Sequence, residues 1–197
     1  MPQNSNEIVA GRDVIAYVEP WAAANTFPTI SAWGSSPGGS WVDQGYTKDG
    51  AHVQWRMQYQ EYTVDQQLDP VARIPSQRDL RLRANLGQID AASMVNATGQ
   101  GTSTSTAAST GVRGHNDFTL TGTIAANYYS VYYDVRSPVS GEAARIVGWQ
   151  GRSVGDINID FHIPDLAQIN LEYALVPDTS VSPARIAQLQ VITPALP

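Results

Sequence analysis

A strict two-residue alternation of apolar and polar side chains is the feature that most constrains the fold of this chain. From Ala51 to Gln60, apolar residues occupy every odd position and polar residues every even one. Successive side chains of a β-strand point to opposite faces, so this period predicts a half-buried strand with one apolar face and one wet face. The same alternation returns at Asp79–Leu86 and Ala167–Leu175. The sequence therefore predicts a mainly β fold.

Other segments complete this interpretation. Asp90–Ala97 is predicted to be one short flanking α-helix, because apolar residues recur there at a spacing of three. Gly99 follows and can end the helix in the left-handed conformation. Five further segments have the composition of strands: Val14–Val18, Phe118–Ile124, Tyr128–Val135, Ala144–Trp149 and Ile157–Ile163.

Long loops are predicted to join these elements. Residues 65–78 form a long inter-strand connection, because Pro70 and Pro75 interrupt it. Residues 97–114 are a Gly/Ser/Thr-rich tract with a single charge, which predicts a flexible loop.

The ends of the chain are less regular. In the C-terminal segment 177–197, Ser182-Pro183 is typical of a helix start, whereas the residues from Ile186 onwards equally suit a strand. Both alternatives stay open. No shift in composition and no repeat divides the sequence, so residues 1–197 are expected to be a single domain with residues 1–7 as an N-terminal arm.

Composition excludes several classes of protein. With 42% hydrophobic and 15% charged residues the chain should fold rather than stay disordered. It has no Cys, which removes disulfides and thiolate chemistry and suits a reducing cytoplasm. No apolar run is long enough for a membrane span, and no export signal is expected. A net charge of −6 opposes non-specific binding to nucleic acid.

The search for catalytic, cofactor and metal sites predicts none, so the protein is not expected to be an enzyme or to hold a cofactor. The histidines lack the spacing of zinc ligands, and the acidic alternation after Gly155 lacks the glycine and distal Glu of a calcium loop. Glu142 and Asp134 could form a glycosidase pair only if the fold set them at the right separation. The residues weighed and set aside as ligands are His52, His115, His162, Asp156, Asn158 and Asp160.

Aromatic residues offer a different kind of site. Trp55 and Tyr59 share the apolar side of the alternating strand, so core packing is predicted for them. Trp21, Trp33 and Trp41 lie in loop-like sequence. There, burial against a neighbouring subunit and binding of a glycan are both open, and the subunit interface is favoured because aromatic residues are enriched at interfaces.

The stretch Ser-Trp-Val-Asp-Gln-Gly-Tyr-Thr-Lys-Asp-Gly at 40–50, followed at once by the long alternating strand, resembles the major tail tube proteins of long non-contractile-tailed (siphovirus-type) bacteriophages. An early strand and a strand that leads into a short helix agree with the same family. The residues of the motif-like turn are Trp41, Gly45, Tyr46, Thr47, Asp49 and Gly50.

This resemblance implies a β-sandwich or barrel that assembles into rings of six, with inner strands joined into one barrel and rings stacked into a tail tube. The tube is a virion conduit for genome delivery, built in the host cytoplasm. The implied partners are further copies of the chain, the tape measure, tail terminator and distal tail proteins, and double-stranded DNA that passes without specific binding. Six domains of roughly 40 Å diameter leave an opening of roughly 40 Å, which admits a DNA duplex.

Charge and loop length extend this expectation. Six copies at −6 each carry −36 per ring, and an acidic wall would repel the genome rather than hold it. Contacts between rings are expected from the N-terminal arm and from the 65–78 connection, since flexible segments can order against a partner. The candidate contact residues are Asp65, Gln67, Asp69, Pro70, Arg73 and Arg78.

Two alternatives remain. A tail terminator or a capsid decoration protein would be another virion component with a related fold. A carbohydrate-binding β-sandwich module belongs to a different class of protein. It would be a monomer whose exposed Trp side chains bind sugars.

Overall fold

The computed structural model describes residues 13–23, 25–26, 37–63, 65, 69–87, 90–124, 127–137, 141–155, 157 and 169–191. These residues form one helix and nine strands, and every strand pair is antiparallel. The predicted mainly β class with one short helix is confirmed. In chain order the elements are β1 (Asp13–Pro20), β2 (Val42–Tyr62), β3 (Ala72–Leu86), α1 (Ala91–Thr98), β4 (Thr102–Thr106), β5 (His115–Thr119), β6 (Tyr129–Ser137), β7 (Gly141–Ser153), β8 (Ile169–Leu175) and β9 (Ala187–Val191).

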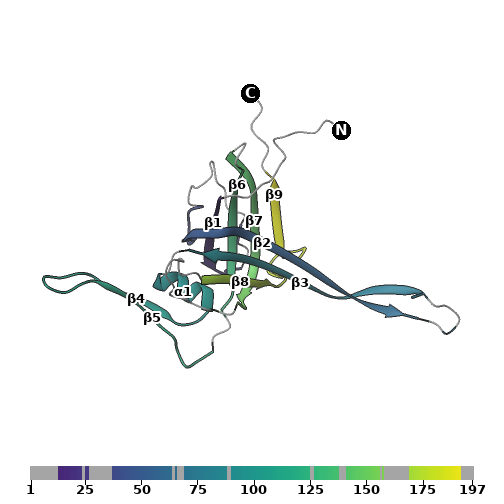
Figure 1. The fold of residues 1–197 in the computed structure, drawn as a ribbon. Coiled ribbons are helices and arrows are strands. Elements are labelled where there is room, and N and C mark those ends of the chain that lie inside the picture. The colour runs from purple at the N-terminus through teal and green to yellow at the C-terminus, as the bar shows by residue number, and fades with distance from the viewer. Residues whose placement is uncertain are drawn as a thin grey trace.

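Six of the strands close into a barrel. Their hydrogen-bonded order is β6, β1, β2, β3, β8, β7, and β7 pairs back onto β6. β8 pairs with β7 at Gly151–Ser153, and β9 pairs with an earlier stretch of β7, Ala144–Gly148. Two hairpins project from this body on opposite sides, β2–β3 on one and β4–β5 on the other (Figure 1). Closure removes the sheet edges of the body, so the hairpins and β9 carry the edges that remain exposed.

The interior of the barrel is filled by alternate residues of its strands. The apolar side predicted for Asp79–Leu86 faces this core, and so does the described part, Ile169–Leu175, of the strand predicted at Ala167–Leu175. The principal core residues are Val14, Ala16, Val18, Leu80, Leu82, Ala84, Leu86, Val131, Tyr133, Ile169, Leu171 and Tyr173. Local periodicity therefore predicted the inward face of these two strands correctly.

Two glycines allow β7 to pass from one partner strand to the next. Gly148 pairs with Ala187 of β9, and Gly151 pairs with Leu175 of β8. A Cβ atom on Gly148 or Gly151 would lie only 2.7 Å or 2.8 Å from the Leu175 side chain. A larger residue at either position would force the Leu175 side chain to shift, so the close packing at this junction depends on glycine.

A second apolar cluster lies on the outside of the barrel. It consists of Tyr17, Tyr132, Val147 and Trp149, all at most 2% exposed. Trp41 packs against it with its ring 5.9 Å from that of Tyr132. Side chains on both faces of β1, β6 and β7 are thus buried, which makes this wall of the barrel rigid.

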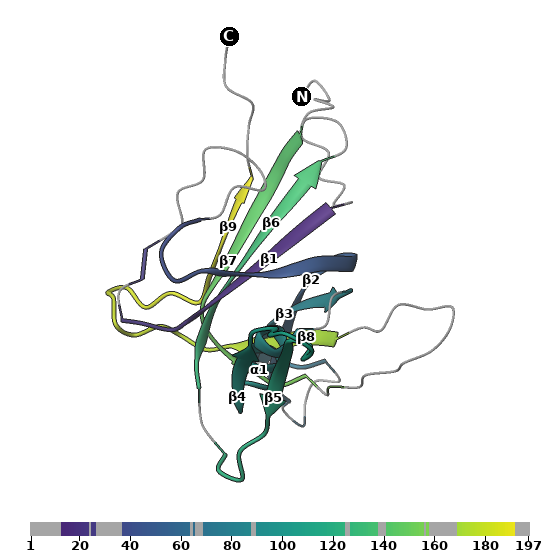
Figure 2. The ribbon, with the colours of Figure 1, turned by 90° about the vertical axis from the view of Figure 1, so that its left-hand side faces the viewer.

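The helix is where the sequence predicted it. Asp90 caps its N-terminus, with Oδ1 accepting a 2.8 Å hydrogen bond from the backbone N–H of Ser93. Gly99 ends it at φ 66°, as expected of a left-handed cap. The Tyr173 hydroxyl donates to the carbonyl of Asn96 at 2.8 Å and so ties α1 to the barrel. Figure 2 shows α1 beside β4 and β5, against the β8 end of the barrel.

The prediction of a loop over residues 65–78 was wrong beyond Val71. From Ala72 onwards these residues belong to β3 and pair with β2 up to Tyr62. Pro75 does not prevent the pairing, because it lies opposite Tyr59 at a β-bulge, on a stretch of β3 that has β2 as its only neighbour among the described strands. Proline is tolerated at bulges and on edge strands because it has no N–H to donate to a ladder.

The prediction of a flexible loop over 97–114 was wrong for part of the tract, whereas residues 107–114 do form the loop between β4 and β5. The helix continues to Thr98, and β4 then pairs with β5 from Thr102↔Thr119 to Thr106↔His115. Thr is β-branched and favours strands, a preference that the Gly/Ser content of the tract concealed.

Two other predicted strands differ from the structure, and the alternative left open at the C-terminus is decided. The strand predicted at Phe118–Ile124 ends at Thr119 and begins earlier, at His115. Ile157 is not in a strand, and the rest of Ile157–Ile163 lies outside the described residues. In the C-terminal segment the strand alternative is confirmed over the described residues, as β9.

Candidate functional site

The outer part of the β2–β3 hairpin, from Trp55 to Leu80, is a two-stranded ribbon that we call the arm (Figure 1). β1 pairs with β2 only as far as Tyr46, and β8 pairs with β3 only from Arg81 onwards. Beyond these points the described strands offer the hairpin no third neighbour. The pairs from Trp55↔Leu80 to Tyr62↔Ala72 extend for about 25 Å at the usual rise per residue of a strand.

The arm carries large apolar side chains that are exposed. Their exposed fractions lie between 38% and 53%, and the residues are Trp55, Met57, Tyr59, Tyr62, Val71 and Ile74. The prediction that core packing explains Trp55 and Tyr59 was therefore wrong, since both are about half exposed. Large exposed apolar side chains gathered on one projecting element favour a site of interaction with another molecule.

Both sides of the outer arm are apolar. Met57 and Tyr59 lie on the same side as Trp55, because side chains two residues apart share a face. Ile74 pairs with Gln60 and lies on the opposite side, together with Tyr62. A ribbon that covers a flat surface needs only one apolar side, so the two apolar sides favour an arm that is enclosed by its partner.

Few side-chain contacts join the described residues of the arm to one another. The exposed ion pair between Arg73 Nε and Glu61 Oε1 is 2.8 Å long, and the Ser76 hydroxyl donates to the carbonyl of Gln58 at 3.2 Å. An exposed ion pair contributes at most about 1 kcal/mol, and an isolated hairpin is only marginally stable in water. The arm would therefore gain much of its order from binding.

The candidate contact residues fall at several places along the arm. Asp65, Asp69 and Pro70 lie in its tip, between the two strands. Arg73 is in the outer part of β3, and Arg78 is at the base. Gln67 and the N-terminal arm 1–7 lie outside the described residues.

The motif expected to form a turn is instead part of a strand. Residues 42–50 all belong to β2, and the motif residues Gly45 and Gly50 have φ values of 83° and 76°. The register with β3 shifts between Lys48 and Ala51, so the motif bends a continuous strand by a bulge. Thr47 Oγ1 donates to the carbonyl of Val14 at 2.6 Å and fixes β2 to β1. Trp41 packs on Tyr132, Tyr46 pairs with Ile15, and Asp49 lies within the bulged stretch.

The polar side of the β2–β3–β8 sheet carries a charge network at the base of the arm. Glu172 Oε1 accepts hydrogen bonds from Arg81 and Arg83 at 2.9 Å each, and Arg81 also pairs with Asp79 at 2.8 Å. Burial of Glu172 opposes its ionisation, but the hydrogen bonds from Arg83 and Arg81 outweigh burial and hold the pKa of the carboxyl below its usual value. The network joins β3 to β8 at the point where the arm leaves the barrel.

We expect Glu172→Gln to destabilise the protein by about 1–2 kcal/mol at pH 7, because it removes the carboxylate that both Arg81 and Arg83 contact. A Glu carboxyl whose pKa is lower in the folded protein than in the unfolded chain, where it is about 4.3, stabilises the folded protein at pH values above the unfolded pKa. This stabilisation is lost as the pH falls through the pKa of the folded protein. Urea unfolding should therefore show a gap between wild type and variant at pH 7 that narrows below about pH 4. Asp79→Asn, which removes a carboxylate whose only ion-pair partner among the described residues is Arg81, should show a smaller gap. A gap for Glu172→Gln that is equal at both pH values would contradict this assignment.

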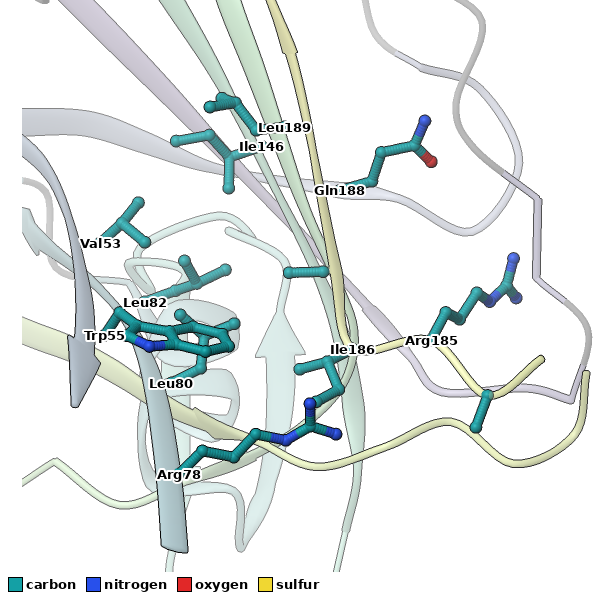
Figure 3. Close-up of a pocket in the computed structure, with 12 residues that line it drawn as sticks. Val53, Trp55, Arg78, Leu80, Leu82, Ile146, Arg185, Ile186, Gln188 and Leu189 are labelled. Carbon is teal, nitrogen blue, oxygen red and sulfur yellow. The ribbon is translucent and has the colours of Figure 1, made fainter. Parts of the chain in front are cut away.

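An apolar pocket of about 520 Å³, which we call the groove, lies between the base of the arm and β9 (Figure 3). Val53, Trp55 and Leu80 line one side, and Ile186 and Leu189 line the other. Three polar side chains, Arg78, Arg185 and Gln188, border the groove. The second edge of β9 pairs with no described strand, so its backbone groups are open to another strand.

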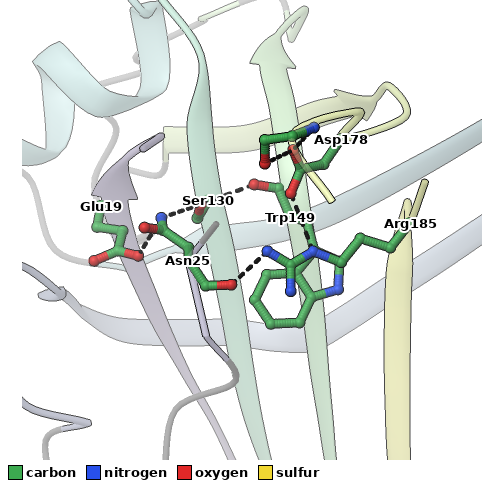
Figure 4. Close-up of polar contacts among 7 residues, drawn as sticks. Glu19, Asn25, Ser130, Trp149, Asp178 and Arg185 are labelled. Atoms are coloured by element: carbon green, nitrogen blue, oxygen red, sulfur yellow. Dashed lines mark hydrogen bonds and ion pairs between the residues drawn. The ribbon is translucent and has the colours of Figure 1, made fainter. Parts of the chain in front are cut away.

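A buried ion pair, which we call the clamp, holds the segment that leads into β9 (Figure 4). Asp178 is fully buried, and its Oδ2 accepts a 3.0 Å hydrogen bond from Arg185 Nε. The guanidinium of Arg185 lies 3.6 Å from the centre of the Trp149 ring and also donates to the carbonyl of Asn25. Asn25 donates in turn to Glu19 at 2.8 Å. The clamp thus connects the wall of the groove to β1 and β7.

Sequence patterns did not indicate the groove or the clamp. Asp178 and Arg185 are seven residues apart in a segment without periodicity, and the groove joins residues separated by more than a hundred positions. The alternation of β2 did signal the arm, but its apolar side was assigned to the core.

The polar residues weighed as ligands do not come together. Among the described residues no group of three or more His, Asp or Glu side chains could hold a metal ion. His52 is on β2 and His115 on β5, and Asp134 is buried 3.8 Å from Arg145. Glu142 is on β7, and His162, Asp156, Asn158 and Asp160 lie outside the described residues. Trp21 is half-buried beside β6, and Trp33 also lies outside.

A scan of the sequence against protein-family models finds no match, and a search of curated proteins finds no match either. In the described part of the chain, no helix has the length and apolar character needed to cross a membrane.

Proposed function

We propose that this protein is a structural subunit that assembles through its arm into stacked rings, and that the stack is the tail tube of a long-tailed bacteriophage. The observation that carries the proposal is the exposed apolar arm on a closed barrel. Six large apolar side chains on the arm lie in solvent in the single chain. Burying them against another copy would stabilise an assembly through the hydrophobic effect.

The shape of the molecule favours an assembly that repeats. The arm and the barrel are different surfaces, so an arm that contacts the body of the next copy makes a head-to-tail contact. Contacts of this type close into rings or continue as helical stacks, whereas a two-fold contact would stop at a dimer. The rigid barrel and the projecting arm suit a subunit that holds its neighbours in fixed positions.

The resemblance of residues 40–50 to major tail tube proteins supports the finer assignment. In this proposal the partners are further copies of the chain, with tape measure, tail terminator and distal tail proteins at later stages, in the virion and in the host cytoplasm during assembly. Double-stranded DNA passes through the bore. The net charge of −6 per copy supports passage without binding, because it offers phosphates no net positive partner.

Negative-stain electron microscopy of the purified full-length chain tests the proposal. Over a range of protein concentrations we expect rings and stacks of rings. Single rings that never stack would instead indicate a tail terminator. A strictly monomeric protein whose Trp fluorescence is quenched by sugars would overturn the proposal in favour of a carbohydrate-binding module, for which the half-exposed Trp55 would be the platform.

A further inference from the structure

We infer that the groove is the receptor for the arm of a second copy of this chain, with the acidic tip of the arm placed beside Arg78. The inference rests on the proposed function and identifies the two surfaces that meet. The groove offers apolar side chains on both of its sides, and the outer arm presents apolar side chains on both of its faces. Each surface therefore supplies what the other lacks.

Charge favours this occupant over an unrelated apolar partner. Arg78 at one end of the groove forms no ion pair with any described residue of its own chain. The tip of the arm between Tyr62 and Ala72 contains Asp65 and Asp69 and no basic residue. A tip with two carboxylates beside an unpaired guanidinium would align the arm in one direction within the groove.

The free edge of β9 supplies a second means of recognition. β9 pairs with β7 along one edge, and the described strands leave its other edge open next to the groove. A strand of the incoming arm can pair with this edge, in the way that extended segments add to an exposed sheet, while its side chains fill the groove. The pocket of about 520 Å³ has room for several apolar side chains of that strand.

The arm cannot fill the groove of its own chain. The groove is bounded by Trp55 and Leu80, the first pair of the arm, and the arm extends away from it for about 25 Å. Its outer part can therefore reach only the groove of another copy. The contact is head-to-tail and can repeat from copy to copy.

Charge reversal tests the pairing. Arg78→Glu alone, or Asp65→Arg with Asp69→Arg, should raise the protein concentration needed for assembly at least about tenfold. All three substitutions together should restore assembly to within about threefold of wild type. Arg56→Glu is the matched control, because Arg56 lies on the polar side of β2 and does not border the groove. Thermal unfolding of each variant shows that the barrel is intact.

Disulfide cross-linking tests the contact between the arm and the groove directly. The chain has no Cys of its own, so only the introduced residues can form a disulfide. Val71→Cys and Gln188→Cys are made as separate proteins, one with a larger tag, and are mixed under oxidising conditions. We expect a mixed disulfide-linked dimer at several times the yield of a control mixture of Val71→Cys with Thr104→Cys, a position on β4. A disulfide needs Cα atoms within about 7 Å, so the mixed product reports direct contact.

The outcomes separate this inference from the function it rests on. If wild-type protein forms rings or tubes but the mixed disulfide stays at the control yield, or the triple charge variant fails to recover, the groove is not the receptor and the proposed function stands. If wild-type protein does not assemble at any concentration, the proposed function is overturned and the inference with it.

Discussion

A protein whose arm is cut back to its base is expected to fold normally and to lose assembly. Gln58 and Gln77 are directly paired, so residues 59–76 can be replaced by Asn-Gly, a two-residue turn that suits an antiparallel hairpin. The change removes four of the six exposed apolar side chains of the arm and no residue of the barrel core. We expect the free energy of unfolding to change by no more than about 1 kcal/mol, since only exposed surface is lost.

Assembly should respond much more strongly. Aromatic anchors at an interface commonly contribute about 2 kcal/mol or more each, so the loss of Tyr59 and Tyr62 should reduce assembly by well over tenfold. Sedimentation velocity and electron microscopy measure this loss. As a control, the β4–β5 hairpin is shortened between its paired ends Thr106 and His115 by the same Asn-Gly turn, which should leave assembly intact. Normal tubes from the arm variant would exclude the arm as the assembly surface.

Periodicity predicted which residues share a face of a strand, but not what that face meets. In β3 and β8 the predicted apolar side fills the barrel, because neighbouring strands surround it. In β2 the same alternation at Trp55 and Tyr59 faces solvent, because the hairpin has already left the barrel at that point. A two-residue period shows that one face of a strand is apolar and needs to be covered. Either the core of the same chain or a partner molecule can cover it.

Prediction also failed where a structure depends on distant residues. Gly148 and Gly151 matter because Leu175 fills the space beside them, and nothing near them in the sequence indicates this. The groove likewise requires the register of β9 on β7 together with that of β2 on β3. The helix was predictable because its cap residues Asp90 and Gly99 act within a few positions.

Asp178→Ala is expected to lower the stability of the protein by about 2–3 kcal/mol, because it leaves the guanidinium of Arg185 largely buried without its carboxylate. Because the side chain of Arg185 is 25% exposed, water can partly solvate its charge, and the loss of stability should be small for a broken buried ion pair. Burial of Asp178 opposes ionisation, but hydrogen bonds from Ser180 and Arg185 outweigh it and lower the pKa of the carboxyl. The Asp178 carboxyl is therefore ionised at pH 7, and its removal should have its full effect on stability there. The melting temperature should fall by about 5–10 °C.

The same substitution should weaken assembly although it lies outside the groove. The clamp holds the segment that continues into Ile186 and Leu189, so its loss frees one wall of the groove while the arm stays unchanged. Asp117→Ala is the matched control: it removes an exposed carboxylate that pairs with His115 on the other hairpin, and should change stability by less than about 0.5 kcal/mol.

A double variant, Asp178→Ala with Arg185→Ala, should be less destabilised than the sum of the two single variants. The reason is that Arg185→Ala removes the charge that Asp178→Ala alone leaves unpaired. Additive losses would show that Asp178 and Arg185 do not act as a pair.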